Sequence, residues 1–441
     1  MKKTLIALAL ALPSLTSAAT DNYRFAFGAK QAAPGYTAVQ ADTTYTDARG
    51  YGFESGAKLA TILDKPDKPN AGAFIRADGP FFFTADLPEG NYNVTVTFGD
   101  SSASRLTVKS EIRRLMLENV STAPGEIATR TFTVNIRTPK IPAVRGLAAG
   151  VVNLKAPRET INQAAAWDRR LTLEFNADHP TIRTLEIAPV KVPTVFLLGD
   201  STVCDQLGEP YSSWGQMLPR FFKPGIAVAN HAESGETYRD SIGRRRLDKI
   251  LSLIKPGDTV IMQFGHNDQK QIKDDKGGPF TTYKAEIKTH VDAIRLHGGA
   301  PVLVSPMERR RFDDKGKAFA TLTDYAEAAR QSATELKVPF IDLHAMSMPF
   351  YQALGPEKSK LAFAEPTPGN VDNTHHNNYG SYELAKMIVT SIRQARLEPA
   401  AFIVDDFVNF DPAKPDPVEA FAVPRSPNVS LVRPLGDEGN Q

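Results

Sequence analysis

A serine and an Asp-x-x-His pair have the residue types and the spacing that nucleophilic catalysis needs. Ser201 stands in the motif GDST, directly after an apolar run, and Asp372 stands three residues before His375. A serine hydroxyl becomes a strong nucleophile when a base takes its proton, and an imidazole base needs a carboxylate to orient it. Because Asp372 can fold back to Nδ1 of His375 on one short loop, Nε2 is left to face Ser201. The pattern therefore predicts acyl transfer, although a helix N-cap serine and a loop of capping side chains would also fit it.

Two further motifs could supply hydrogen-bond donors for the negative charge that develops in such a reaction. HAESGET follows a second apolar run, and its Gly235 could bring a backbone N–H close because glycine has no side chain. GHND follows a third apolar run, and its Asn267 carries an amide N–H. These two donors could form an oxyanion hole. Glycine and asparagine are common in loops, so only the combination of the motifs is specific.

The histidines also allow a metal site, which the rest of the sequence does not favour. Asp372, His375 and His376 could together bind a metal ion, but no further ligand pattern accompanies them and no H-E-x-x-H motif occurs. Cys204 is the single cysteine, which excludes an intramolecular disulfide and a cysteine-based zinc site. We therefore expect neither a metal nor a cofactor, and we expect His376 to be a neighbour of the site rather than its base.

Alternating strands and helices are predicted after residue 190, and they would bring these motifs together. Five continuous apolar runs indicate strands that are covered on both faces, and amphipathic segments such as 281–297 separate them. This alternation predicts an α/β fold with a doubly wound parallel sheet, in which ligands bind beyond the carboxyl ends of the strands. The runs are 194–200, 226–232, 258–265, 300–307 and 338–343.

A different pattern occupies the first part of the chain, up to about residue 190. Its short runs are rich in β-branched and aromatic residues, and turn residues separate them. In the run 91–99, apolar side chains from Tyr92 to Phe98 alternate with polar ones, as in a strand with one buried face. Several such strands without intervening helices predict an all-β sandwich.

The two ends of the chain differ from the rest. Residues 1–19 begin with two lysines, continue with the apolar run 5–12 and end in small residues, which predicts a secretory signal peptide. The apolar run is too short to span a membrane. At the other end, residues 398–441 contain prolines that forbid a long helix, so we expect an irregular tail and assign it no function.

The composition excludes some classes of function. The 441 residues are 41% hydrophobic and 23% charged, which is typical of a globular chain with more than one domain. Lys and Arg total 52 against 50 Asp and Glu, so the basic excess expected of a nucleic-acid binder is missing. No second long apolar stretch occurs. We expect a secreted or periplasmic protein that is monomeric and has no nucleic-acid or membrane partner.

Taken together, GDST, Gly235, GHND and DNTH resemble the four sequence blocks of the SGNH (GDSL-like) hydrolases. Residues 192–396 look similar to the rhamnogalacturonan acetylesterases of that superfamily, and the preceding stretch looks like the β-sandwich module of some bacterial members. The resemblance implies a galactose-binding-like module at 20–190 and a flavodoxin-like SGNH hydrolase domain at 191–397.

Carried over residue by residue, the resemblance makes Ser201 the nucleophile, His375 the general base and Asp372 its orienter. The oxyanion hole would consist of the backbone N–H groups of Ser201 and Gly235 and the side chain of Asn267. One departure is the motif ESGET, where many relatives have Gly-Gly-Arg-Ser, and it leaves the substrate contacts of that loop open.

The resemblance further implies a carbohydrate esterase that removes O-acetyl groups from plant cell-wall polysaccharide, in particular rhamnogalacturonan or pectin. Acetylxylan or another glycan O-acetyl ester is an alternative substrate. In another class, the protein could be a non-catalytic carbohydrate-binding protein, although the intact set of Ser201, Asp372 and His375 argues against it. 

Some residues near the motifs could contact such a substrate. The arginines at 239, 244–246 and 309–311 could bind uronate carboxylates or simply form a solvated face. Trp214 and Tyr238 could stack on sugar rings, or Trp214 could belong to the core.

Overall fold

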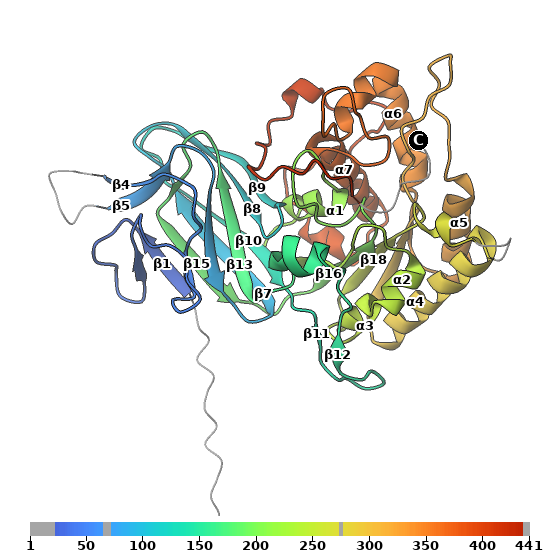
Figure 1. The fold of residues 1–441 in the computed structure, drawn as a ribbon, viewed down its shortest axis with the longest axis horizontal. Coiled ribbons are helices and arrows are strands. Elements are labelled where there is room, and N and C mark those ends of the chain that lie inside the picture. The colour runs from blue at the N-terminus through green and yellow to red at the C-terminus, as the bar shows by residue number, and fades with distance from the viewer. Residues whose placement is uncertain (1–22, 65–71, 273–276, 435–441) are drawn as a thin grey trace, which may run out of the picture.

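The computed structural model describes residues 23–64, 72–272 and 277–434, and it places two differently built halves side by side (Figure 1). The first half is all β, and the second combines a parallel sheet with helices. This architecture confirms the predicted combination of an all-β region with an α/β domain. The predicted signal peptide, residues 1–19, lies outside the described residues.

Two five-stranded β-sheets pack face to face in the first half. The strands of this half are β1 (Tyr23–Phe27), β2 (Thr37–Val39), β3 (Tyr51–Phe53), β4 (Leu59–Leu63), β5 (Ala73–Ala77), β6 (Phe81–Asp86), β7 (Gly90–Phe98), β8 (Ser104–Ser110), β9 (Arg114–Thr122), β10 (Ala128–Ile136), β11 (Lys140–Ile141), β12 (Gly150–Val151), β13 (Arg170–Asn176), β14 (Thr181–Ile182) and β15 (Thr184–Pro189). One large sheet has the order β10-β7-β15-β1-β2 and the other β3-β6-β13-β8-β9. Smaller sheets are formed by β14-β5-β4 and by β11-β12.

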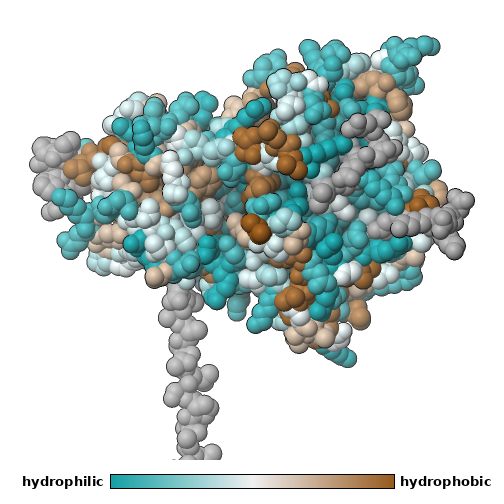
Figure 2. Space-filling view, in the orientation of Figure 1, coloured by the Kyte–Doolittle hydropathy of each residue, from teal (hydrophilic) through white to brown (hydrophobic). Residues whose placement is uncertain are grey.

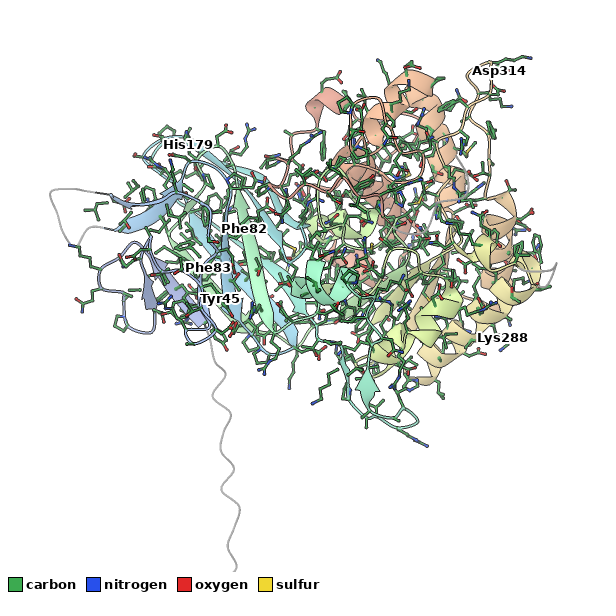
Figure 3. All side chains as sticks on the ribbon, in the orientation of Figure 1. Tyr45, Phe82, Phe83, His179, Lys288 and Asp314 are labelled. Atoms are coloured by element: carbon green, nitrogen blue, oxygen red, sulfur yellow. The ribbon has the colours of Figure 1, made fainter. Side chains whose placement is uncertain are left out.

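Aromatic side chains from the two large sheets interlock in the core of the sandwich. The ring of Phe83 on β6, labelled in Figure 3, lies 5.1 Å from the rings of Phe25 and Phe27 on β1 and 5.4 Å from that of Phe53 on β3. Each buried ring of this kind contributes roughly 2 kcal/mol. The alternation predicted along β7 is confirmed, since every second side chain from Tyr92 to Phe98 is buried.

The edge strand β9 was not indicated by the sequence pattern. Its sequence RLMLENVST contains Leu, Met and Glu, which are good helix formers, and its buried and exposed positions do not alternate. Register irregularities in its pairing with β8 and a positive φ of 46° at Asn119 break the period of two. Pairing with β8 therefore decides the conformation of this segment, against its local preference.

Five parallel strands form the sheet of the second half, namely β16 (Thr194–Gly199), β17 (Ala227–Asn230), β18 (Thr259–Gln263), β19 (Ala300–Val304) and β20 (Phe340–Ile341). Their order is β17-β16-β18-β19-β20, so the first strand of this half lies between the second and the third. This order is flavodoxin-like and confirms the predicted doubly wound sheet.

Helices cover both faces of this sheet. On β16, Val195 and Leu197 belong to one hydrophobic cluster, and Phe196 and Leu198 belong to another. The helix α7 contributes to the first cluster and α4 to the second. The helical segments are α1 (Trp214–Met217), η3 (Leu218–Phe221), α2 (Tyr238–Gly243), α3 (Arg246–Leu251), η4 (Asp268–Gln271), η5 (Pro279–Tyr283), α4 (Lys284–Leu296), α5 (Thr323–Leu336), α6 (Leu343–Lys358), η6 (Ser359–Ala362) and α7 (Asn378–Gln394).

Buried ion pairs join the two halves. Arg114 on β9 lies 3.6 Å from Asp205 of the second half, and its Nη1 donates to the carbonyl of Val228 on β17. Removing one partner of a buried ion pair such as Arg114 and Asp205 typically costs about 3 to 5 kcal/mol of stability.

Between β12 and β13, residues 152–167 extend from the first half to the second, and this linking segment contains the short helical segments η1 (Arg158–Asn162) and η2 (Ala164–Ala166).

The Pro-rich tail packs against both halves. It contains the short helical segments η7 (Glu398–Phe402) and η8 (Val418–Ala420), and no long helix occurs in its described residues. Its last described part, residues 424–434, is called the strap below. Lys109 and Asn176 of the sandwich donate to the carbonyls of Pro424 and Arg425, at 2.7 and 2.8 Å. The tail is therefore an ordered connection between the halves over these residues.

Hydrophobic side chains on the face drawn in Figure 2 gather in an interrupted band near the junction of the halves. Exposed apolar residues of the strap include Val429, Leu431 and Val432.

Within the described ranges, no helix is both long enough and apolar enough to cross a bilayer.

Candidate active site

Ser201 lies just beyond the carboxyl end of β16 and is hydrogen-bonded to a histidine from a distant part of the chain. Its Oγ is 2.9 Å from Nε2 of His375. The two side chains are buried, with Ser201 3% and His375 1% exposed. The structure thus brings the hydroxyl and the imidazole that the sequence singled out into direct contact.

A turn, and not a helix, carries Ser201. The side chain of Asp200 accepts hydrogen bonds from the backbone N–H and the hydroxyl of Thr202, at 2.9 and 2.8 Å. The alternative that Ser201 is a helix N-cap does not hold, because no helix begins after it in this described stretch and α1 begins only at Trp214, with Ser213 as its N-cap. An Asp side chain that bonds the backbone two residues ahead favours a turn over a helix, which accounts for this conformation.

Asp200 is itself fixed from the neighbouring strand. Its Oδ2 lies 3.3 Å from Nδ1 of His266, which follows β18. Burial alone would raise the pKa of Asp200, but His266 and the donors of Thr202 hold that pKa below its usual range. The carboxylate therefore stays charged and keeps the turn of Ser201 in place.

Asp372 and His375 share one loop that leads into α7. Oδ2 of Asp372 is 2.9 Å from Nδ1 of His375, and Oδ1 accepts the backbone N–H groups of Thr374 and His375, at 2.8 and 3.0 Å. A carboxylate only accepts hydrogen bonds, so Nδ1 must carry the proton and Nε2 of the neutral ring must accept from Ser201. Burial would raise the pKa of Asp372, but the attraction of His375 and these donors hold that pKa well below its usual range.

Gly235 occupies the position of a tight turn that needs a positive φ. The N–H of Glu236 donates to the carbonyl of Glu233 at 3.2 Å, and Gly235 is the third residue of the turn with a φ of 74°. A residue with a side chain would be strained at this position. Because β16 lies between β17 and β18, the loop after β17 lies next to Ser201.

Asn267 reaches the same place from the other side. It follows β18, is 3% exposed, and its Nδ2 donates to the carbonyl of Glu236 at 3.2 Å. This bond orients the amide against the turn of Gly235, and the amide group has a second N–H. The three expected donors therefore lie on adjacent strand ends.

Cations from the linking segment 152–167 hold the turn of Gly235. The Nε of Arg158 donates to Glu233 at 2.6 Å, and the Nη2 of Arg158 donates to the Ser234 hydroxyl at 2.8 Å. Lys155 lies 2.7 Å from the carboxylate of Glu236. Glu233 and Glu236 are buried, so their charges require these partners.

Another cation from outside the expected site reaches Asp372. Arg433 of the strap donates from Nε to Oδ2 at 2.8 Å and from Nη2 to Oδ1 at 3.2 Å. The sequence pattern indicates no function for the tail and no role for Lys155 or Arg158. No local motif marks these residues, and only the fold brings them to the site.

Several other residues that the sequence offered lie elsewhere. His376 donates to or accepts from the hydroxyl of Tyr351 at 2.9 Å, and burial lowers the pKa of His376 to about 3, so it is a neighbour and not the base. Trp214 and Tyr238 are buried in the core and cannot stack on a sugar. Arg246 is 1% exposed and paired with Glu159, which excludes it as a surface contact for uronates.

Metal binding finds no support in the described ranges. Over these residues, no group of three or more His, Cys, Asp or Glu side chains is placed to hold a metal ion. Cys204 is buried beside the hydroxyl of Ser234, at 3.4 Å, and burial raises the pKa of its thiol. The site offers a hydroxyl, an imidazole and N–H donors, which suit acyl transfer.

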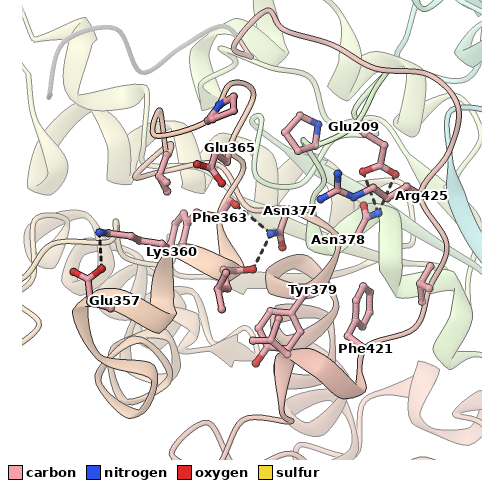
Figure 4. Close-up of a pocket in the computed structure, with 16 residues that line it drawn as sticks. Glu209, Glu357, Lys360, Phe363, Glu365, Asn377, Asn378, Tyr379, Phe421 and Arg425 are labelled. Atoms are coloured by element: carbon pink, nitrogen blue, oxygen red, sulfur yellow. Dashed lines mark hydrogen bonds and ion pairs between the residues drawn. The ribbon is translucent and has the colours of Figure 1, made fainter.

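A cavity of about 670 Å³ lies between α7 and the tail, next to the loop of Asp372 and His375 (Figure 4). Asn378 and Tyr379 line it from the start of α7, and Phe421 and Arg425 line it from the tail. Ser201, Asp372 and His375 are not among the lining residues. The cavity is therefore separate from the candidate active site.

Two family models match this chain. The GDSL-like lipase/acylhydrolase model matches residues 197–381, and the model of the galactose-binding-like domain of β-agarase and YXIM-like esterases matches residues 23–142.

Among the curated relatives, rhamnogalacturonan acetylesterase RhgT of Bacillus subtilis (strain 168) is 38% identical over 214 residues, which cover 46% of this chain and 90% of RhgT. The uncharacterized esterase YxiM of the same bacterium is 26% identical over 387 residues, or 84% of this chain and 91% of YxiM. The probable rhamnogalacturonan acetylesterase YesY, also from that bacterium, is 32% identical over 215 residues, or 48% of this chain and 98% of YesY. The likeness to YxiM extends over both halves.

Proposed function

Since this chain belongs to the GDSL-like lipase/acylhydrolase family and is a carboxylic ester hydrolase, we propose that it removes O-acetyl groups from plant cell-wall polysaccharide, in particular rhamnogalacturonan or pectin. The observation that carries the proposal is the distance of 2.9 Å between Oγ of Ser201 and Nε2 of His375. The names of the relatives RhgT and YesY support the choice of substrate.

The proposed reaction has two steps. Nε2 of His375 takes the proton of Ser201, and Oγ attacks the acetyl carbonyl carbon. The N–H groups of Ser201 and Gly235 and the second N–H of Asn267 bind the resulting oxyanion. His375 then returns the proton to the departing sugar hydroxyl. Water, deprotonated by the same imidazole, releases acetate from the acetyl-enzyme, while Asp372 keeps Nδ1 protonated throughout.

The surroundings of Ser201 favour a short acyl group. Ser201 is only 3% exposed, and Asn267 is exposed to the same small extent. A long lipid chain would need a wide apolar approach to the hydroxyl, whereas an acetyl group occupies little more space than the reacting carbonyl itself.

Acetate release tests the proposal. We expect acetate from acetylated rhamnogalacturonan at a higher kcat/KM than from acetylated homogalacturonan or acetylxylan, and turnover of p-nitrophenyl acetate. Ser201→Ala should abolish both activities. Ser213→Ala, which removes a buried N-cap serine of α1, should lower stability by about 1 kcal/mol and keep the activity.

Three results would change the proposal. Full activity of folded Ser201→Ala would overturn the assignment of the nucleophile. A preference for acetylxylan would keep the mechanism and replace the substrate. Glycan binding without hydrolysis of any ester would support a non-catalytic carbohydrate-binding protein instead.

We also propose that residues 1–19 are cleaved during export, that the mature protein is secreted or periplasmic and that it is monomeric. The proposed division is a sandwich module at 20–190, a catalytic domain at 191–397 and a tail at 398–441. Sequencing of the mature N-terminus should begin at Thr20, and light scattering should give the mass of one chain.

A further inference from the structure

The guanidinium of Arg433 donates hydrogen bonds to both oxygens of the Asp372 carboxylate. Nε lies 2.8 Å from Oδ2, and Nη2 lies 3.2 Å from Oδ1. Such a fork holds a carboxylate in one plane, which a lysine cannot do. Oδ2 is also the oxygen that accepts from Nδ1 of His375. One carboxylate oxygen therefore joins the arginine to the imidazole.

The strap brings Arg433 to this place through several anchors. The hydroxyl of Ser426 is 2.7 Å from the buried Glu174 of β13, and the N–H of Ser426 donates to Glu209 at 3.0 Å. Further along, the backbone of Glu209 exchanges hydrogen bonds with Asn428 and Ser430, both at 2.8 Å. The guanidinium is thus held by ordered backbone on its N-terminal side.

Glu209 connects the strap to the two halves. Its carboxylate lies 2.6 Å from Arg113 of the sandwich and accepts from Nδ2 of Asn378, the first residue of α7, at 2.9 Å. The loop of Asp372 and His375 leads directly into this helix. The strap and the loop therefore share one support.

We propose that Arg433 is a positioning residue of the active site, which fixes the carboxylate of Asp372 and thereby the imidazole of His375. This inference rests on the proposed hydrolytic function. At least five donor contacts hold Asp372: two from Arg433, two from backbone N–H groups and one from His375. Without Arg433, only contacts from its own loop remain among these, and the carboxylate loses the two bonds that fix its plane from outside the loop.

The test compares Arg433→Gln, Arg433→Lys and the control Arg425→Gln in the full chain. Arg425 lies on the same strap and is exposed. With p-nitrophenyl acetate, we expect Arg433→Gln to lower kcat about tenfold with KM changed less than twofold, because positioning and not binding is lost. Arg433→Lys should restore only part of kcat, because a lysine cannot form the fork, and Arg425→Gln should match the parent protein.

A second measurement does not depend on turnover. The proton on Nδ1 of His375 should give a downfield NMR signal that disappears in Asp372→Asn, and Arg433→Gln should shift or broaden it. An unchanged signal together with an unchanged kcat would overturn the inference. If the parent protein hydrolyses no ester but the signal responds, the proposed function fails while the positioning role stands.

Discussion

Nε of Arg158 donates to the carboxylate of Glu233 at 2.6 Å, and this ion pair ties the linking segment to the turn that presents Gly235. Burial raises the pKa of Glu233, and Arg158 counteracts that effect. A residue outside the second half thus sets the position of an expected oxyanion donor. The sandwich and its linking segment are therefore structurally coupled to the site.

Replacing Arg158 should impair catalysis. In Arg158→Gln the buried Glu233 loses its partner and the turn shifts, so we expect kcat to fall about tenfold or more with a small change in KM. Steady-state kinetics on p-nitrophenyl acetate measures this effect. The matched control is Arg239→Gln, which breaks an exposed pair with Glu286 just after the same turn. Parent-like kinetics of folded Arg158→Gln would show that the turn of Gly235 keeps its conformation without this ion pair.

Asn267 should contribute only when negative charge develops. We expect Asn267→Ala to lower kcat about 100- to 1000-fold while KM stays within a few fold, as for the loss of one oxyanion donor. Gln269→Ala serves as the control, since Gln269 lies in the same loop and bonds the carbonyl of His266. A loss confined to KM would assign Asn267 to substrate binding instead.

Asp372→Asn should lower turnover by roughly 1000-fold or more. An asparagine amide can donate to Nδ1, which would place the imidazole proton on Nε2 and prevent it from accepting the proton of Ser201. Single-turnover release of p-nitrophenol measures the acylation step directly. Circular dichroism should show that the fold persists. Retained acylation would mean that Asp372 supports the loop and does not set the tautomer.

Asp168 should make stability depend on pH. Burial raises the pKa of Asp168 to about 6, opposed by a bond from the N–H of Arg170. Since the folded pKa exceeds the unfolded value of about 4, the stabilisation is full below pH 4 and is lost as the pH rises through 6. Partial exposure reduces the effect, so we expect Asp168→Asn to raise the free energy of unfolding by about 1 kcal/mol at pH 8 and to change little at pH 4.

Urea unfolding at the two pH values checks this expectation. The exposed Asp178→Asn is the control and should show no such difference. An equal effect of Asp168→Asn at both pH values would rule out the titration of Asp168 as the cause.

The sequence predicts those parts of the fold and site that depend on local pattern. Apolar runs locate β16 to β20, because strands covered on both faces must be continuously apolar. Asp372 and His375 lie three residues apart, so their contact is local and a sequence pattern can suggest it. Ser201 could be placed near them only because carboxyl strand ends share one edge of the sheet.

Contacts that depend on the path of the whole chain could not be predicted this way. Lys155 and Arg158 are ordinary basic residues in their own segment. Their role depends on ion pairs with Glu236 and Glu233, which lie far away in the sequence and share no repeating pattern with them. The same holds for Arg433, which stands in an irregular tail without a local signal. The alternative of a helix N-cap at Ser201 fails for a local reason, since Asp200 bonds the backbone ahead and favours a turn.

The course of the strap also bears on the order in which the active site assembles. Arg433 stands 61 residues after Asp372, and the strap that carries it is anchored on Glu174 and Glu209. The clamp on Asp372 would then close last, after both halves have formed the surfaces that anchor the strap. Under this order, a chain whose halves are folded but whose strap is undocked holds its nucleophile less firmly aligned, and full hydrolytic power comes with docking.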